Sequence, residues 1–218
     1  MSIPSQAELW EMKALGAANL YHGQEERGAL DPAIKPIDPA MKLAGPALTV
    51  DVPKGDNLAL HMAISKAAPG TVLVVDYKGH MDVAVTGDIM ALAAQQRGLA
   101  GMVVDGAVRD ADEISRLGFP LFARGLSIRG PAKAGPGSVG KPIKLGRVAI
   151  NSGDIVVGDR DGVVVLGQAD WAQALEAARQ RDAREEEVRM ELLTGRTTVE
   201  LMDLPGESIE MSLPGDGA

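Results

Sequence analysis

Apolar residues recur at two different periods in the first half of the chain. Residues 57–67 and 88–97 mix apolar positions with good helix formers and stop near proline or glycine, which predicts two helices. Residues 71–75 and 100–104 are continuous apolar runs, which predict buried strands. A shorter helix is expected over 111–117, before a glycine. This alternation predicts an α/β core.

The parts of the chain on either side of this core follow other patterns. A capping-box pattern starts at Ser5, and apolar residues at helical spacing follow it up to Leu15, just before a glycine. Residues 29–44 contain three prolines and no helical period, which predicts an irregular connection. Apolar runs bounded by glycine-rich turns predict short strands at 47–52, 121–123, 148–150, 154–157 and 162–166.

The last predicted helix is long and mostly charged. Asp170 can cap a helix over 171–193, which at 1.5 Å per residue exceeds about 30 Å, more than a core of this size needs. Arg181 and Glu185 are spaced to pair along it. A solvated helical face is the simplest interpretation. We expect one domain over 1–195 and an extended or disordered extension over 196–218.

Composition narrows the class of protein. The chain has 218 residues, of which 45% are hydrophobic, enough for one substantial core. Its net charge of -8 disfavours a nucleic-acid partner, which needs clustered Lys and Arg. The absence of cysteine excludes disulfides and thiolate chemistry. We expect a cytoplasmic protein with no membrane partner, because no signal-like core and no apolar run near 20 residues is present.

Polar groups gather at two predicted helix starts. Thr86 or Gly87 can cap the helix that begins at Asp88, and the second short helix opens after Arg109 and Asp110. Free amide N–H groups at a helix start bind anions, and a guanidinium grips a carboxylate in bidentate fashion. A small carboxylate is therefore expected between residues 87–90, which are Gly87, Asp88, Ile89 and Met90, and Arg109.

The same stretch is rich in acids. Asp88, Asp110 and Glu113 are more carboxylates than Arg109 alone requires, and hard oxygen ligands of this kind suit Mg²⁺ or Mn²⁺. The alternative interpretation is that they only occupy the first turns of two helices, where acids are favoured. His61, inside the helix predicted over 57–67, is expected to be a satisfied surface or core residue rather than a ligand.

These residues carry a resemblance to a known family. Residues 87–88 followed by 104–113 resemble the motif of the class II pyruvate aldolases that cleave 4-hydroxy-4-methyl-2-oxoglutarate and 4-carboxy-4-hydroxy-2-oxoadipate, and of their relatives, the regulators of ribonuclease E activity. The resemblance covers roughly residues 10–195. Other segments that fit the family pattern are 45–50, 55–57, 118–125, 153–154 and 158–163.

The resemblance implies a swivelling β/β/α-type single domain with a long C-terminal helix. It also implies that Asp110 holds a divalent metal, with Glu113 acting through water. The regulator type lacks acids that the metal site needs, whereas Asp110 and Glu113 are both present here, which favours the enzyme branch. Related aldolases bring a glutamate of the last helix into a neighbouring active site; Glu185 is the best match, with Glu186 and Glu187 one or two positions away. A homotrimer or a hexamer is therefore expected.

The function that the resemblance implies is a metal-dependent lyase of the kind used in aromatic compound catabolism. It would cleave a 4-hydroxy-2-oxo acid to pyruvate and decarboxylate oxaloacetate, with Mg²⁺ or Mn²⁺ polarising the keto oxygen. Arg109, Asp88 and Glu185 are the expected catalytic residues, the latter two placing a metal-associated water as the base. Two alternatives stay open: a non-catalytic, protein-binding regulator, and a lyase of the same fold acting on another keto acid.

Overall fold

The computed structural model describes residues 3–205 and 209. The chain forms two compact units, residues 1–179 and residues 180–218. The predicted α/β class with a long C-terminal helix is confirmed. The predicted division into a domain over 1–195 and an extension over 196–218 stays a prediction.

The first unit is built on one mixed sheet with the strand order β1-β5-β4-β3-β2-β9-β10. Its centre is parallel: β2 pairs with β3, β3 with β4 and β4 with β5. Antiparallel strands β1, β6, β9 and β10 complete it, and β7 and β8 form a separate hairpin. The strands are β1 Lys35–Pro36, β2 Leu43–Asp51, β3 Val72–His80, β4 Gly101–Val108, β5 Leu121–Leu126, β6 Ser138–Val139, β7 Ile143–Leu145, β8 Val148–Ile150, β9 Ile155–Asp159 and β10 Gly162–Leu166.

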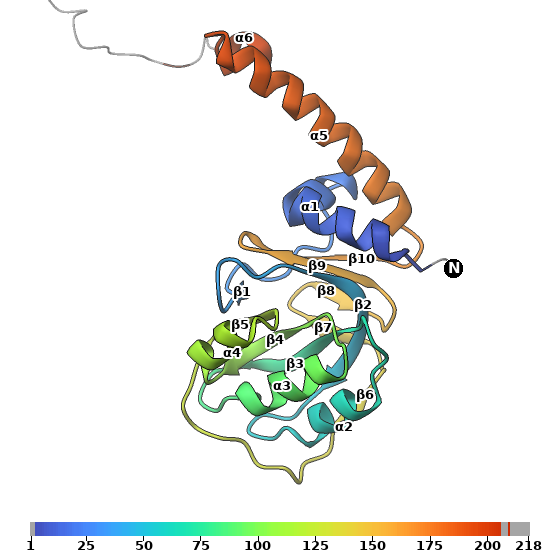
Figure 1. Ribbon diagram of the computed structural model, residues 1–218, viewed down its shortest axis with the longest axis vertical. Helices are drawn as coiled ribbons and strands as arrows, with labels where there is room; N and C mark the ends of the chain where they lie inside the picture. Colours follow the sequence, from blue (N-terminus) through green and yellow to red (C-terminus); the bar gives the residue numbers. More distant parts are fainter. Residues whose placement is uncertain (1–2, 206–208, 210–218) are drawn as a thin grey trace, which may run out of the picture. The chain divides into compact units, whose positions relative to one another are not determined.

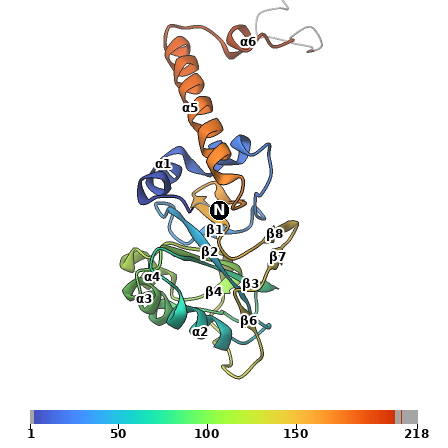
Figure 2. The same ribbon diagram turned by 90° about the vertical axis from the view of Figure 1, so that its right-hand side faces the viewer.

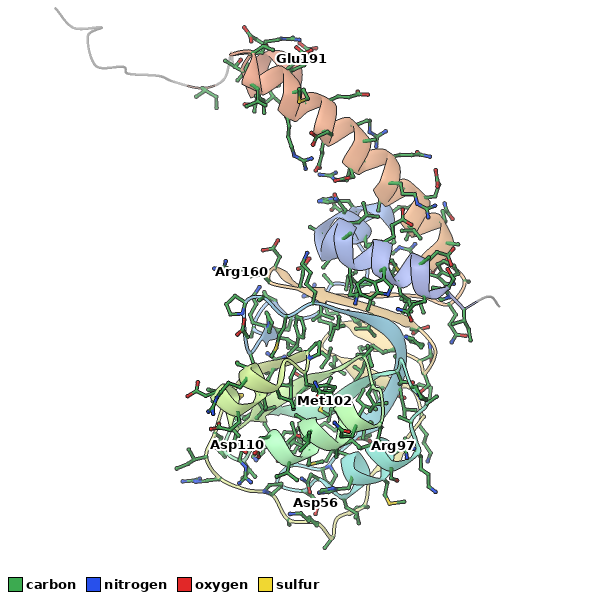
Figure 3. The ribbon with its side chains drawn as sticks, in the orientation of Figure 1. Asp56, Arg97, Met102, Asp110, Arg160 and Glu191 are labelled. Atoms are coloured by element: carbon green, nitrogen blue, oxygen red, sulfur yellow. The ribbon has the colours of Figure 1, made fainter. Side chains whose placement is uncertain are left out.

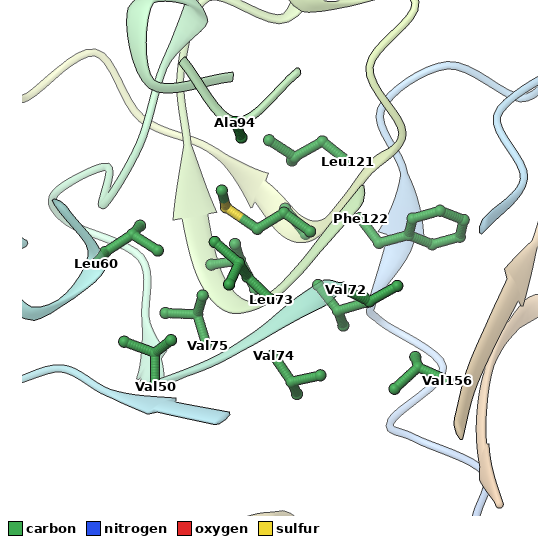
Figure 4. Packing of buried hydrophobic residues seen from close by; sticks show 14 of the residues in the cluster. Val50, Leu60, Val72, Leu73, Val74, Val75, Ala94, Leu121, Phe122 and Val156 are labelled. Carbon is green, nitrogen blue, oxygen red and sulfur yellow. The ribbon is translucent and has the colours of Figure 1, made fainter. Parts of the chain in front are cut away.

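Helices α2 (Leu58–Lys66), α3 (Asp88–Gln96) and α4 (Ala111–Leu117) lie on one side of the parallel strands, as both views in Figures 1 and 2 show. The hairpin β7–β8 lies on the other side (Figure 2). Side chains alternate along a strand, so β3 contributes side chains to both faces of the sheet. Leu73 and Val75 point toward α2 and α3, whereas Val74 points away from them (Figure 4). The continuous apolar run in β3 is thus explained by burial on both faces.

A second cluster of buried apolar residues lies on β9 and β10. It is formed by α1 (Gln6–Gly23) and by the first two turns of α5 (Trp171–Leu193). The first helical segment ends before Gly16, as predicted, because the backbone of Gly16 is not helical, and a second helical segment follows directly within α1. Gly16 has a φ of 84° and kinks the helix, and the N–H of Ala17 donates to the Asp159 carboxylate at 2.7 Å. The helix therefore bends at Gly16, and the N–H of Ala17, which has lost its partner within the helix, is satisfied by Asp159.

The strands that lead to the site are longer than their apolar runs. The strand predicted over 100–104 runs on as β4 to Val108 through a change of register, and the strand predicted over 71–75 likewise continues as β3 to His80. A Cβ on Gly106 would lie 2.6 Å from Tyr77 Cδ1. The missing side chain lets β3 and β4 stay paired where the register shifts.

The second unit contains the end of α5 and helix α6 (Thr198–Leu201). Arg181 pairs with Glu185 at 2.6 Å, as the spacing predicts. The prediction of an extended or disordered arm is wrong for 198–201, where Thr197 and Glu200 form a capping box. Residues 206–208 and 210–218 of that arm lie outside the described residues. Among residues 3–205 and 209, no helix has the length and apolar character needed to cross a membrane.

We expect Arg124→Met to lower the free energy of unfolding by about 3 kcal/mol, because it leaves a buried charge unpaired. Arg124 contacts the carboxylate of Asp105, which is buried, and that of Asp31 at 3.0 Å. The measurement is urea unfolding followed by circular dichroism. Arg116→Met is the control, because Arg116 is exposed and its pair with Glu113 lies at the surface. Equal losses in the two variants would refute this account.

Candidate active site

The start of α3 is an open group of backbone donors. Gly87 is its N-cap and has no side chain to accept from the first amides of the helix. The first N–H groups of a helix have no partner within it. One of them, the N–H of Asp88, donates to Asp110 Oδ2 at 3.3 Å. The anion-binding helix start predicted at residues 87–90 therefore has the backbone arrangement that such a site needs.

Arg109 and Asp110 approach this helix start from the end of β4. Asp110 is the N-cap of α4 in the left-handed conformation, with a φ of 58°, and Figure 3 shows it beside that helix. Its Oδ2 lies 3.2 Å from Arg109 Nε. A Cβ on Gly87 would lie only 2.2 Å from the same oxygen and 3.0 Å from Arg109 Cγ. Glycine at position 87 thus permits the close approach of both side chains.

A pocket of about 250 Å³ opens at this point. Among the predicted site residues, its wall contains residues 87–90 and Arg109. Asp110 lines a neighbouring hollow of about 310 Å³, which Arg109 shares. The structure thus brings Gly87, Asp88 and Arg109 to one cavity and places Asp110 at its edge.

The other wall of the pocket comes from residues that sequence reasoning did not assign. Asn57, His61, Thr86, Pro131 and Lys133 all line it. The family-like segment 55–57 was a signal for Asn57, but nothing in the sequence joins Lys133 to a helix seventy residues earlier. The expectation that His61 is satisfied is wrong: among residues 3–205 and 209, its buried Nε2 has no hydrogen-bond partner. Burial, and then the charge of Lys133, lower the pKa of His61, which favours the neutral imidazole.

Asp56 fixes the loop that carries Lys133. Its carboxylate accepts from the N–H groups of Leu58, Ala134 and Gly135 at 2.7–2.8 Å. These backbone hydrogen bonds, that of Leu58 first, lower the pKa of Asp56. Two further backbone bonds join the loop to the start of α2, Asn57 N–H to Ala132 O and Ala132 N–H to Gly55 O. The loop is therefore attached to the helix that supplies the opposite side chains.

The donor set fits a magnesium-like ion held by few protein ligands. Within residues 3–205 and 209, no group of three or more His, Asp or Glu side chains is placed to hold a metal. Mg²⁺ often uses one or two carboxylates and fills its remaining positions with water and substrate oxygens. Asp110, at the edge of the pocket and partly exposed, fits that mode.

Glu113 and Glu185 have other partners in this chain. Glu113 Oε1 lies 2.8 Å from Arg116 Nη2, one turn along α4. Glu185 belongs to the second unit, where it pairs with Arg181 at 2.6 Å and with Arg189 at 3.4 Å. Their predicted roles in metal and proton chemistry stay predictions.

We expect Gly87→Ala to weaken carboxylate binding about tenfold or more. The new Cβ must displace Asp110 and Arg109, whose geometry a bidentate contact needs. The measurement is calorimetric titration with oxalate in the presence of Mg²⁺. Gly167→Ala is the control, because its Cβ would meet mainly the end of the Asp170 side chain at 3.0 Å, and we expect unchanged affinity there. Unchanged affinity in Gly87→Ala would contradict this view of the site.

We expect the stability of the protein to fall below about pH 6.5 in a way that depends on His61. The pKa of His61 is lower in the folded state, so the unfolded state takes up protons first as the pH falls. The stabilising contribution is therefore present above the unfolded pKa and is lost toward the folded one. Urea midpoints at pH 7.5 and 5.5 should differ less in His61→Gln than in the wild type. His22→Gln, which changes an exposed histidine, should behave as wild type.

Comparison with known proteins places this arrangement in a family. A family model described as RraA-like, Aldolase/RraA, matches residues 15–165. A protein of Halalkalibacterium halodurans with the provisional name 4-hydroxy-4-methyl-2-oxoglutarate aldolase is 42% identical over 157 residues, which are 72% of this chain and 75% of that protein.

Two solved structures are similar along most of their length. An uncharacterized protein of Pseudomonas syringae pv. tomato superposes with a TM-score of 0.79 at 28% identity, covering 94% of this chain and 100% of that one. The RNA-processing inhibitor RraA of Thermus thermophilis superposes with a TM-score of 0.64 at 31% identity, covering 68% of this chain and 90% of that one. The family model and the relative from Halalkalibacterium halodurans lead to one conclusion: the chain belongs to the RraA-like family, described as Aldolase/RraA.

Proposed function

We propose that this protein is a divalent-metal-dependent lyase that cleaves a 4-hydroxy-2-oxo acid of the 4-hydroxy-4-methyl-2-oxoglutarate type and releases pyruvate. The observation that carries the proposal is the pocket in which Arg109 faces the start of α3, where the N-cap residue Gly87 has no side chain to accept from the helix amides. Both features suit the carboxylate of a 2-oxo acid. The relative named as an aldolase of that substrate supports the same reaction class.

In the proposed complex, the backbone N–H groups at residues 87–90 and the Arg109 guanidinium bind the carboxylate next to the keto group. Arg109 reaches both the pocket and the hollow beside Asp110, so its guanidinium also lies near the keto oxygen. It offsets the negative charge that develops there during cleavage. Asp110, with Glu113 through water, would hold Mg²⁺ or Mn²⁺, whose contribution is to polarise the keto oxygen.

Cleavage breaks the bond between C3 and C4. The C4 hydroxyl loses its proton, C4 becomes a carbonyl, and the electron pair of the broken bond forms the enolate of pyruvate. Return of a proton to C3 gives pyruvate. Oxaloacetate passes through the same enolate when its C4 leaves as carbon dioxide, so we expect it to be a second substrate of the pocket.

The proton acceptor in this proposal is a water positioned by Asp88 and by Glu185 of a neighbouring copy. Asp88 lines the pocket at the first position of α3. The role of Glu185 requires a trimer or a dimer of trimers. In this proposed assembly, charged residues of α5 in one copy would contribute to the active site of the adjacent copy. That contribution would be the function of the long polar helix.

A protein-binding regulator is the second candidate. The likeness to RraA of Thermus thermophilis, described as an RNA-processing inhibitor, favours it. The presence of Asp110, whose carboxylate lies 3.2 Å from Arg109 Nε, and of Glu113 favours the lyase instead, because the resemblance implies that the regulator type lacks acids that the metal site needs.

We expect wild-type protein to release pyruvate from 4-hydroxy-4-methyl-2-oxoglutarate and from oxaloacetate with Mg²⁺ and to stop when EDTA is added. Arg109→Ala should lower kcat/KM at least about 100-fold, since loss of one charged donor to a developing oxyanion costs that much. The measurement is NADH consumption coupled to lactate dehydrogenase.

Arg97→Ala is the matched control. Arg97 follows the last turn of the same helix, is exposed, and should leave both rates unchanged. Pyruvate release that continues in EDTA would remove the metal from the proposal. No release from either substrate, with Mg²⁺ bound and the fold intact, would favour the other keto acids or the regulator.

A further inference from the structure

Three side chains on one wall of the pocket carry buried polar atoms without a protein partner. Within residues 3–205 and 209, Asn57 Oδ1, His61 Nε2 and Thr86 Oγ1 make no hydrogen bond. Asn57 and Thr86 are each only 3% exposed, so bulk water does not serve them. A buried polar atom without a hydrogen-bond partner destabilises the folded protein. All three belong to residues that line one pocket, so a ligand bound there could complete these hydrogen bonds if the side chains turn toward it.

The orientation of the Asn57 amide is set by its neighbours. Its Nδ2 donates to the carbonyl oxygen of Val85 at 2.9 Å and lies 3.3 Å from Met90 Sδ. A carbonyl oxygen only accepts, so the nitrogen must be on that side. The free atom is therefore the acceptor Oδ1. A ligand group that satisfies it has to donate a hydrogen bond.

The other two groups, the hydroxyl of Thr86 and the neutral imidazole of His61, can each act as a donor or as an acceptor. The threonine hydroxyl carries both a hydrogen and lone pairs, and the tautomer of a neutral imidazole decides whether its Nε2 donates or accepts a hydrogen bond. A carboxylate can only accept hydrogen bonds, so it would leave Asn57 Oδ1 unpaired. Its negative oxygens would also repel the lone pairs of that atom. A hydroxyl group can donate to Asn57 and accept from Thr86 or His61 at the same time.

We propose that Asn57, His61 and Thr86 form a subsite that binds a hydroxyl group of the ligand whose carboxylate is held by Arg109 and the start of α3. The subsite rests on the proposed function in one respect, namely that the ligand is a small acid bound at this pocket. In a 4-hydroxy-2-oxo acid the group is the C4 hydroxyl. Thr86 directly precedes Gly87, and Asn57 is bonded to Val85, so the subsite adjoins the carboxylate site along the chain.

This arrangement also suits the reaction. For the reaction, the C4 hydroxyl turns its hydrogen from Asn57 to the water positioned by Asp88 and gives its proton to that water, and its oxygen becomes a stronger acceptor. Thr86 and His61 can then both donate to it, whereas the hydrogen bond to Asn57 is lost. The subsite thus selects the hydroxyl in the bound acid and supports the oxygen as the bond between C3 and C4 breaks.

The test compares two ligands that differ by one hydroxyl group. 2,4-Dihydroxyglutarate and 2-hydroxyglutarate lack the 2-oxo group, so neither can be cleaved. Calorimetric titration with Mg²⁺ should give about tenfold tighter binding of the dihydroxy acid by the wild type, the value of one satisfied buried hydrogen bond. Thr86→Val keeps the side-chain shape and should reduce this ratio to about threefold or less.

His61→Leu provides a second variant with the same expected loss of preference. Ser65→Ala is the control, because it removes a hydroxyl that serves Met62 O on the exposed side of α2. Any of three outcomes would overturn the proposal: equal affinity for the two acids in the wild type, no binding of either acid, or a preference that is unchanged in both variants. Ordered water would then be the partner of these three atoms. A hydroxyl preference without pyruvate release would instead retain the subsite and reject the lyase.

Discussion

The close approach of Asp110 to Gly87 is the constraint on which the rest of the site depends. One carboxylate oxygen of Asp110 contacts the N–H of Asp88 and the Arg109 side chain together, in space that a Cβ at position 87 would occupy. Two helices and one strand end meet there, and a Cβ at position 87 would lie only 2.2 Å from Asp110 Oδ2. A bulkier residue would have to separate α3 from the end of β4, and with them the helix start from the arginine.

The sheet brings these parts together because β2, β3, β4 and β5 are parallel. The carboxyl ends of parallel strands lie at one edge, and the helices that follow them begin at that edge. The bulge at Asp105 and Gly106 lets β4 continue four residues beyond its apolar run, to Val108. Arg109 is therefore carried to the helix start of α3 instead of leaving the sheet at a turn.

Much of this fold could be predicted because its signals are local. The apolar run in β3, the glycine before α3 and the acid-rich start of α4 act over a few residues each. The bulge could not be predicted, since it depends on how Gly106 packs against Tyr77. Lys133 escaped assignment for a similar reason. Its place is set by hydrogen bonds from its loop to Asp56, and no short pattern in the sequence encodes such a contact.

Charge in and beside the pocket is nearly balanced before any ligand binds. Arg109 and Lys133 carry two positive charges, and Asp88 and Asp110 carry two negative ones. Glu113 is compensated by Arg116, and the neutral form of His61 adds nothing. An acid with two carboxylates would therefore bring two uncompensated charges into a small cavity, and one divalent cation beside Asp110 would balance them. Since the Debye length is only about 8 Å in cells, this local balance matters more than the net charge of the chain.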